Sequence, residues 1–405
     1  PRVEGRVAIN RLAFARLISQ TGSVGAFTAL AYHLYSLTGS PIWQSAGILA
    51  AVSVGGVAQP IAGALADRVD RRRLMIASDL AGALVSLVIV PLVDVPLALV
   101  ALVAVGALVE APFPPASRAA IPNLIGEDDL AWANGRISAA GAIGFVLGPA
   151  FAALLLAGPG AAGVFVASAV TFSISAVLVT TLHGASFRAE AQPQGDRDGG
   201  AGAGLRAIRA DRGLTLLLLG EVVAFSGIGI AITADAPIAK LFHQTEFGYA
   251  AMITFWGAGT LVASVVTGRV MRKGLEARWL VAGMAVLGLG CLVIGVAPIW
   301  VVVLIGNVVG GLGMGANETS RQTLVQRRVD DAVAGRVFAA LEFAAIGALA
   351  VGTALAGPIL EAAGAQWPYT ICGVTFVLGA LIQVGLLRLP QERGTLVGAG
   401  GGGSG

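Results

Sequence analysis

The chain has 405 residues, of which 56% are hydrophobic and only 12% are charged, and its formal net charge is +3. Soluble domains carry about 25% charged residues, so this composition argues against a water-soluble enzyme, a nucleic-acid-binding protein and a disordered chain. A helix needs about 20 apolar residues to cross a membrane, and the length leaves room for about twelve such helices with their loops.

The sequence predicts six membrane-spanning helices on either side of one long polar segment. Backbone groups in lipid must be hydrogen-bonded within their own segment, so each apolar run is expected to be helical. The first six spans are expected at 9–37, 43–66, 74–93, 97–118, 131–157 and 162–182. The second six are expected at 213–239, 248–271, 279–297, 299–321, 333–361 and 367–388.

The polar segment divides the chain into two units. We expect an N-terminal six-helix bundle at 1–188, a flexible linker at 189–212, with a short surface helix near its end, and a C-terminal bundle at 213–392. A flexible tail is expected at 393–405, where the Gly-rich end is typical of an added linker. The fold class is therefore an all-α membrane protein.

The cationic residues predict the orientation of these spans. On this map, all but two of the 26 Lys and Arg residues fall on one face, the exceptions being Arg16 and Lys240. Lys and Arg are enriched in cytoplasmic loops, so both termini and the linker are expected to be cytoplasmic, in the inner membrane of a bacterium. The basic balance thus indicates topology, and we expect no nucleic-acid partner.

The two halves resemble each other at an offset of about 203–205 residues. Ser117 and Arg118 correspond to Ser320 and Arg321 at this offset. Two copies of a six-helix unit joined by a linker are typical of secondary transporters. In that design the substrate binds between the halves near the midplane, and rocking of the halves exposes the site to either side in turn.

The strongest motif lies between the second and third spans. It reads Gly63-Ala-Leu-Ala-Asp67-Arg68-Val-Asp-Arg71-Arg72-Arg73, and a degenerate copy begins at Gly268. This motif resembles the signature loop of the major facilitator superfamily. The resemblance implies two pseudo-symmetric six-helix bundles with twelve transmembrane helices, and a conformational role for Gly63, Asp67, Arg68, Arg71, Arg72 and Arg73.

Other segments resemble the drug, macrolide and siderophore exporters of that superfamily. They are Leu-Thr-Gly-Ser at 37–40, the Pro-rich run at 114–125, Gly335-Arg336, and Gly144-Phe-Val-Leu-Gly148-Pro149, which looks like the GxxxGP element of antiporters. Small residues spaced in this way also let helices pack closely, so packing and a rocking hinge both remain open for Gly144 and Gly148. The arginine of the fourth span and the acid of the first span, frequent in proton antiporters, have no equivalent here.

The resemblance implies export of amphipathic small molecules, such as drugs or natural products, coupled to proton entry. Siderophore or lipid export, import without proton coupling, and a non-transporting scaffold or receptor are the alternatives. A small-molecule substrate, protons and membrane lipids are the expected partners of a monomer. We expect no catalytic residue, cofactor or metal, because no phosphate-binding loop is present and the three histidines lack metal-site spacing.

Ionisable residues inside spanning helices are functional candidates, because an isolated charge in lipid is costly. Glu110, Glu221 and Glu342 are the proton-coupling candidates. Arg16 and Glu110 could instead form a structural ion pair, which would leave Glu221 the less encumbered carboxylate, and Glu342 has no cation in sequence reach. The resemblance places spans 1, 4, 7 and 10 around the cavity, where Arg16, Gln20, Phe27, Phe113, Phe225 and Asn307 are the substrate candidates.

Overall fold

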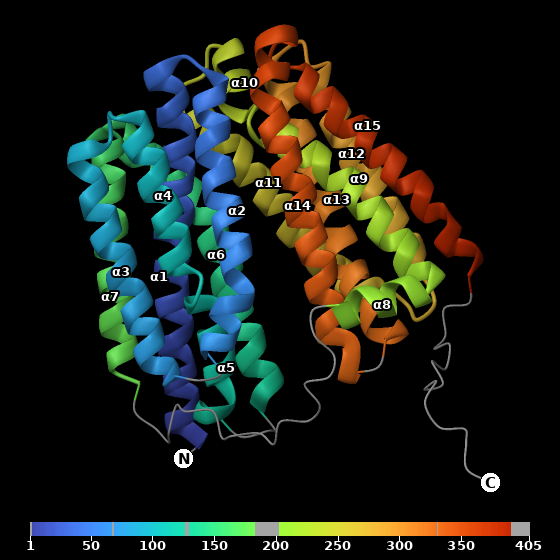
Figure 1. Ribbon diagram of the computed structural model, residues 1–405, viewed down its shortest axis with the longest axis horizontal. Coiled ribbons are helices and arrows are strands. Elements are labelled where there is room, and N and C mark those ends of the chain that lie inside the picture. Colours follow the sequence, from blue (N-terminus) through green and yellow to red (C-terminus); the bar gives the residue numbers. More distant parts are fainter. Residues whose placement is uncertain (1, 67–68, 126–128, 183–201, 330, 390–405) are drawn as a thin grey trace.

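The computed structural model describes residues 2–66, 69–125, 129–182, 202–329 and 331–389, and almost all of them are helical. Figure 1 shows two helical bundles side by side, and within the described ranges no residue belongs to a strand. The expected all-α fold class is confirmed, and the helices form two bundles, one from each half of the chain (Figure 1).

The N-terminal half contains seven α-helices because its fourth span is divided. They are α1 (Arg2–Thr38), α2 (Pro41–Ala66), α3 (Arg71–Ile89), which continues into η1 (Val90–Leu92), α4 (Pro96–Glu110), α5 (Phe113–Leu124), α6 (Leu130–Ala157) and α7 (Gly160–Thr180).

The C-terminal half repeats this order. Its elements are α8 (Gly202–Ala210), α9 (Arg212–Ile232), α10 (Asp235–Leu241), α11 (Glu246–Val270), α12 (Glu276–Gly295), α13 (Trp300–Arg328), α14 (Asp331–Ala363), α15 (Trp367–Gln383) and η3 (Val384–Arg388). The starts of α2, α3 and α4 recur at the starts of α11, α12 and α13 at the offset seen in the sequence.

Eleven helical segments of the described chain are long and apolar enough to cross a membrane. The twelfth long helix is α1, which has 37 residues but is more polar. It packs against α2, α6 and α7, so other helices rather than lipid cover much of its surface. A helix in that position does not need an apolar circumference.

Two predicted spans are interrupted, and α1 and α13 are longer than their predicted spans. The fourth span breaks between Glu110 and Phe113, where Pro112 and Pro114 fit the first turn of a new helix better than the middle of a long one. The seventh breaks between α9 and α10. Helix α13 continues to Arg328, past its predicted end at 321, which places Arg321 within the helix body.

Part of the predicted linker belongs to the C-terminal half. Residues 183–201 and 390–405 lie outside the described residues. The expected short helix is α8, and its Ile208 is fully buried with Leu214, Leu217 and Val325. Helix α8 is therefore attached to the C-terminal bundle by a hydrophobic contact.

The halves meet along α2 with α14 and along α6 with α11. They are close together at the end that carries α10 and diverge toward the end that carries α5 and α8 (Figure 1). We call the latter the basic end, because it holds Arg71, Arg72, Arg73, Arg327 and Arg328. Helix α1 begins and η3 ends there. Near α10, Ala31 and Ile48 of the N-terminal half join the hydrophobic core of the C-terminal half.

Candidate functional site

Two cavities lie between the two halves, and another, lined by the N-terminal half alone, shares wall residues with both. The largest, of about 1030 Å³, lies between α2 and α5 on one side and α13 and α14 on the other, toward the basic end. Deeper in the molecule, a cavity of about 310 Å³ shares Ala51 and Val52 with it. That cavity in turn shares Phe27 and Phe145 with a third of about 320 Å³, which we call the inner cavity.

The inner cavity is mainly apolar and aromatic, and the C-terminal half supplies most of its wall. Three of the predicted cavity residues, Phe27, Phe225 and Asn307, line it. The Asn307 amide nitrogen donates to the carbonyl oxygen of Val303 at 2.9 Å, which fixes the side chain along its own helix. Such a cavity, with few polar groups among aromatic rings, suits an amphipathic ligand.

The other three predicted cavity residues line a separate polar pocket of about 180 Å³ in the N-terminal half. Arg16, Gln20 and Phe113 share its wall with Asp79 and Glu110. The Arg16 guanidinium carbon lies 6.0 Å from the centre of the Phe113 ring. Asp79 is not among the predicted site residues, although an acidic residue inside the third predicted span is a signal for a functional site.

Serine hydroxyls hold the two carboxylates of this pocket. Ser19 donates to Asp79 Oδ1 at 3.1 Å, and Ser23 donates to Glu110 Oε2 at 2.5 Å. Among the described residues, no ion pair within 4 Å involves Arg16, so the expected Arg16–Glu110 ion pair is not formed. Glu110 also lines the cavity of about 310 Å³ in the N-terminal half, which shares wall residues with both cavities between the halves.

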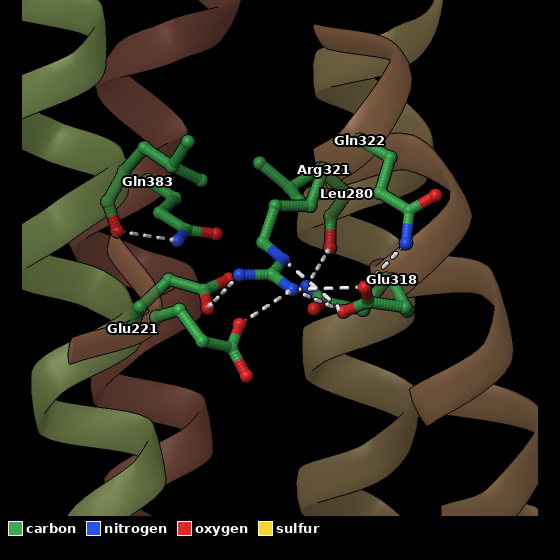
Figure 2. A network of polar contacts seen from close by, with 9 residues as sticks. Glu221, Leu280, Glu318, Arg321, Gln322 and Gln383 are labelled. Carbon is green, nitrogen blue, oxygen red and sulfur yellow. Dashed lines mark hydrogen bonds and ion pairs between the residues drawn. The ribbon is translucent and has the colours of Figure 1, made fainter. Parts of the chain in front are cut away.

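Arg321 of α13 is the centre of a second charged network, in the C-terminal half. Figure 2 shows its guanidinium between Glu221 of α9 and Glu318 of its own helix. It lies 2.7 Å from Glu318 Oε2 and 3.7 Å from both Glu221 Oε2 and Glu342 Oε2. Gln322 also donates to Glu318, at 2.7 Å. The side chain of Glu221 is only 1% exposed, so water does not compensate its negative charge and the positive charge of Arg321 does.

This network adds one contact that the sequence could not show and corrects one expectation. Glu342, which has no cation in sequence reach, lies near Arg321 of another helix, and its side chain is 61% exposed. Glu221 was expected to be the less encumbered carboxylate, yet it faces Arg321, whereas Glu110 faces serine. The predicted tenth span ends at residue 321, so the sequence places Arg321 at the cytoplasmic edge of the membrane.

Gly144 and Gly148 lie where α6 touches α1. A Cβ atom at Gly144 would come within 2.9 Å of the Leu17 carbonyl oxygen, and one at Gly148 within 2.6 Å of the Val24 Cβ. Small residues at this spacing let the two backbones approach closely. The described contacts therefore give these glycines a packing role, and Pro149 lies inside the same helix.

The arginines of the loop motif contact helices of their own half. Arg71 donates to the Ala119 carbonyl oxygen and to Asn123 Oδ1, each at 2.7 Å, which ties the start of α3 to α5. Arg72 donates to the carbonyl oxygens of Val179 and Thr180 at the end of α7. Gly63 lies within α2 and Arg73 follows the N-cap of α3, while Asp67 and Arg68 lie outside the described residues.

The sequence matches the Major Facilitator Superfamily over residues 12–274 and again over 217–403. It is 25% identical to an uncharacterized MFS-type transporter, YfiS, of Bacillus subtilis over 90% of this chain and 89% of that protein. It is 29% identical to the multidrug efflux pump Tap of Mycobacterium tuberculosis, covering 82% and 81% of the two chains. The class C tetracycline resistance protein of Escherichia coli is also 29% identical, with 82% of each covered.

Solved structures show the same fold at low sequence identity. The nucleoside transporter NupG superposes with a TM-score of 0.74 at 14% identity, covering 95% of this chain and all of that one. A D-xylose–proton symporter superposes with a TM-score of 0.72 at 15% identity, covering 93% and 97%. These likenesses concern the arrangement of helices.

Proposed function

Because the chain belongs to the Major Facilitator Superfamily, a family of membrane transporters of small molecules, we propose that it exports amphipathic molecules in exchange for protons. As a member of that family it is a multi-pass membrane transporter and not an enzyme. Relatives named as efflux pumps and as a tetracycline resistance protein support the outward direction.

The basic end is assigned to the cytoplasm. Lys and Arg are enriched on the cytoplasmic side of membrane proteins, and the arginines at the starts of α1 and α3 and at the end of α13 lie at this end. The largest cavity lies toward the same end. On this assignment, we propose that the structure is a conformation that receives substrate from the cytoplasm and is closed near α10.

Cysteine labelling tests this orientation. Arg206 is exposed on α8 and Asp94 is exposed at the opposite end, so each offers a site for a single introduced cysteine in a Cys291→Ser/Cys372→Ser background. A membrane-impermeant maleimide added to intact cells should label Asp94→Cys and leave Arg206→Cys unlabelled. The reverse pattern would overturn the assignment.

The observation that carries proton coupling is the position of Glu110. Glu110 lines two cavities of the N-terminal half, one of which shares wall residues with the inner cavity, and among the described residues its carboxyl group has a serine hydroxyl and no cation within ion-pair distance. A carboxyl group shielded from water favours its protonated form, and exposure to water reverses that preference. Rocking of the halves would thus load and release a proton at Glu110.

The test uses purified protein in proteoliposomes. A ligand is first found by its effect on the melting temperature, since a compound that binds the folded state raises it. Addition of that ligand should move protons, as reported by a pH-sensitive dye inside the vesicles, and Glu110→Gln should abolish the proton movement while ligand still binds. Ligand flux without proton movement would indicate an uncoupled transporter, and binding without flux would indicate a scaffold or receptor.

A further inference from the structure

The wall of the inner cavity contains one carboxylate with no counter-charge. Asp235 begins α10, beyond the membrane-spanning part of α9, and its side chain lines the cavity. Among the described residues that line this cavity, Asp235 is the only one with a charged side chain. The hydroxyl of Tyr369 from α15 donates a hydrogen bond to its Oδ1.

Lys240, the cation of helix α10, contacts Tyr35 rather than Asp235. Lys240 lies over the ring of Tyr35 on α1, with its Nζ 4.6 Å from the ring centre. Within the described part of the chain, no Lys, Arg or His nitrogen lies within 4 Å of the Asp235 carboxylate. An ionised carboxylate in an apolar wall without a cation costs free energy, and a ligand that brings a positive charge recovers part of it.

The rest of the wall suits the apolar parts of such a ligand. Phe27, Phe225, Tyr249 and Trp256 supply aromatic faces from both halves of the protein. Aromatic faces attract cations through their quadrupoles, with tryptophan the strongest, and they also cover hydrocarbon. A tyrosine pair, Tyr32 with Tyr249 at 5.5 Å between ring centres, extends this aromatic surface toward α10.

We propose that the inner cavity binds lipophilic organic cations, with the cationic centre against Asp235 and the hydrophobic groups among the aromatic rings. The inference rests on the proposed transport function and gives it a substrate class. A lipophilic anion of the same shape is excluded by the same carboxylate, and a neutral molecule gains nothing from it. Because the aromatic wall holds one unpaired carboxylate, the cavity selects ligands by their charge rather than by their size.

The same carboxylate makes the binding of a cation dependent on pH. Burial raises the pKa of Asp235 from 3.8 to about 7. The titratable groups that face it are Tyr249 of α11, Tyr369 of α15, Cys291 of α12 and Cys372 of α15, and neither a tyrosine nor a cysteine carries a positive charge. Asp235 is therefore ionised above about pH 7 and protonated below it, so cation affinity should fall as the pH drops from 8 to 6.

The experiment compares two probes of equal shape and opposite charge. Tetraphenylphosphonium and tetraphenylborate are measured by equilibrium dialysis against the purified full-length protein in detergent, at pH 8 and pH 6. Wild-type protein should bind the phosphonium at least tenfold more tightly than the borate at pH 8. Asp235→Asn should remove at least tenfold of the phosphonium affinity and abolish its pH dependence.

Two further variants separate charge from folding. Asp235→Glu keeps the charge and should retain phosphonium binding, whereas Asp94→Asn removes an exposed carboxylate at the same end of the molecule and should change nothing. If Asp235→Asn binds the phosphonium as tightly as wild type, or if both probes bind equally well to wild type, the inference is wrong.

Flux measurements distinguish the inference from the proposed function. Phosphonium binding that depends on Asp235, with no phosphonium transport in proteoliposomes, upholds the cation site and rejects export. Proton-driven transport of a neutral ligand, with phosphonium binding unaffected by Asp235→Asn, upholds the exporter and rejects the cation site.

Discussion

Arg16 of α1 and Glu221 of α9 occupy equivalent positions in the two halves, 205 residues apart, and Arg16 is half-buried whereas Glu221 is buried. Glu221 faces Arg321, which also binds Glu318 and Glu342. Arg16 shares a pocket with Asp79 and Glu110, but these carboxylates accept hydrogen bonds from serines. The repeat thus preserves the helical framework and not the charges: one half has carboxylates paired with an arginine, and the other has carboxylates bound by serine hydroxyls.

The helices that carry these groups also differ. In the N-terminal half, prolines divide the fourth span at Glu110, whereas α13 is continuous and contains glycines at its contacts. A Cβ atom at Gly311 would overlap the Trp256 carbonyl oxygen of α11, and one at Gly313 would lie 2.6 Å from the Gly283 carbonyl oxygen of α12. The C-terminal half is therefore packed backbone to backbone around its charged network, which favours a rigid role.

The largest effect is expected from removing the cation of the paired network. Arg321→Ala leaves Glu221 buried without a counter-charge, which typically costs about 3–5 kcal/mol of folding stability. The thermal melting temperature in detergent should fall sharply, and adding Glu221→Gln should restore part of it. Arg16→Ala, which breaks no ion pair among the described residues, serves as the matched control. Equal losses of melting temperature for Arg16→Ala and Arg321→Ala would contradict the difference in ion pairing between the two halves.

The next largest effect should come from the close packing of α13. Gly311→Ala forces a methyl group into the backbone of α11, and overpacking of this kind costs about 1–3 kcal/mol. Gly347→Ala is the control, because a Cβ atom there meets nothing within 4 Å. Melting curves of both variants in the same detergent provide the measurement. If Gly311→Ala melts at the wild-type temperature, the backbones of α11 and α13 are not in close contact at this position.

Coupling should depend on the unpaired carboxylate rather than the paired one. Glu110→Gln should reduce transport driven by a pH gradient at least tenfold, which corresponds to about 1.4 kcal/mol, and leave the melting temperature nearly unchanged. Glu221→Gln should instead lower the melting temperature and retain coupled transport. The comparison uses flux into proteoliposomes with and without a pH gradient. The opposite pattern would assign coupling to the Arg321 network.

The smallest effect should come from the loop arginines. Arg72→Ala removes the donor to two carbonyl oxygens at the end of α7, and an exposed helix-end interaction of this type contributes about 1 kcal/mol or less. Arg327→Ala should cost more, because it breaks the ion pair with the buried Glu276 in the C-terminal half. Melting temperatures of the two variants give the ranking, and a greater loss for Arg72→Ala would contradict it.

Much of the fold was predictable because each membrane-spanning segment must be apolar and must satisfy its backbone hydrogen bonds within itself. Apolar runs located the twelve spans, the offset of about 205 residues related the halves, and the loop motif indicated the family. The family resemblance, rather than composition, placed Phe27, Phe225 and Asn307 at the cavity, and all three line the inner cavity. The spans and the relation between the halves depend on local composition and on repetition along the chain.

The charge partners could not be predicted in this way. Arg321 is 100 residues from Glu221 in sequence, and hydropathy placed it at the membrane edge because polar residues surround it. Asp235 and Tyr369 are 134 residues apart in sequence and meet only in the folded protein, where the Tyr369 hydroxyl donates to the Asp235 carboxylate. Whether a buried carboxylate faces an arginine, a serine or an open cavity depends on which helices pack together. Tertiary structure alone decides that, because the free energy of a buried charge is set by the neighbours within a few ångströms of it.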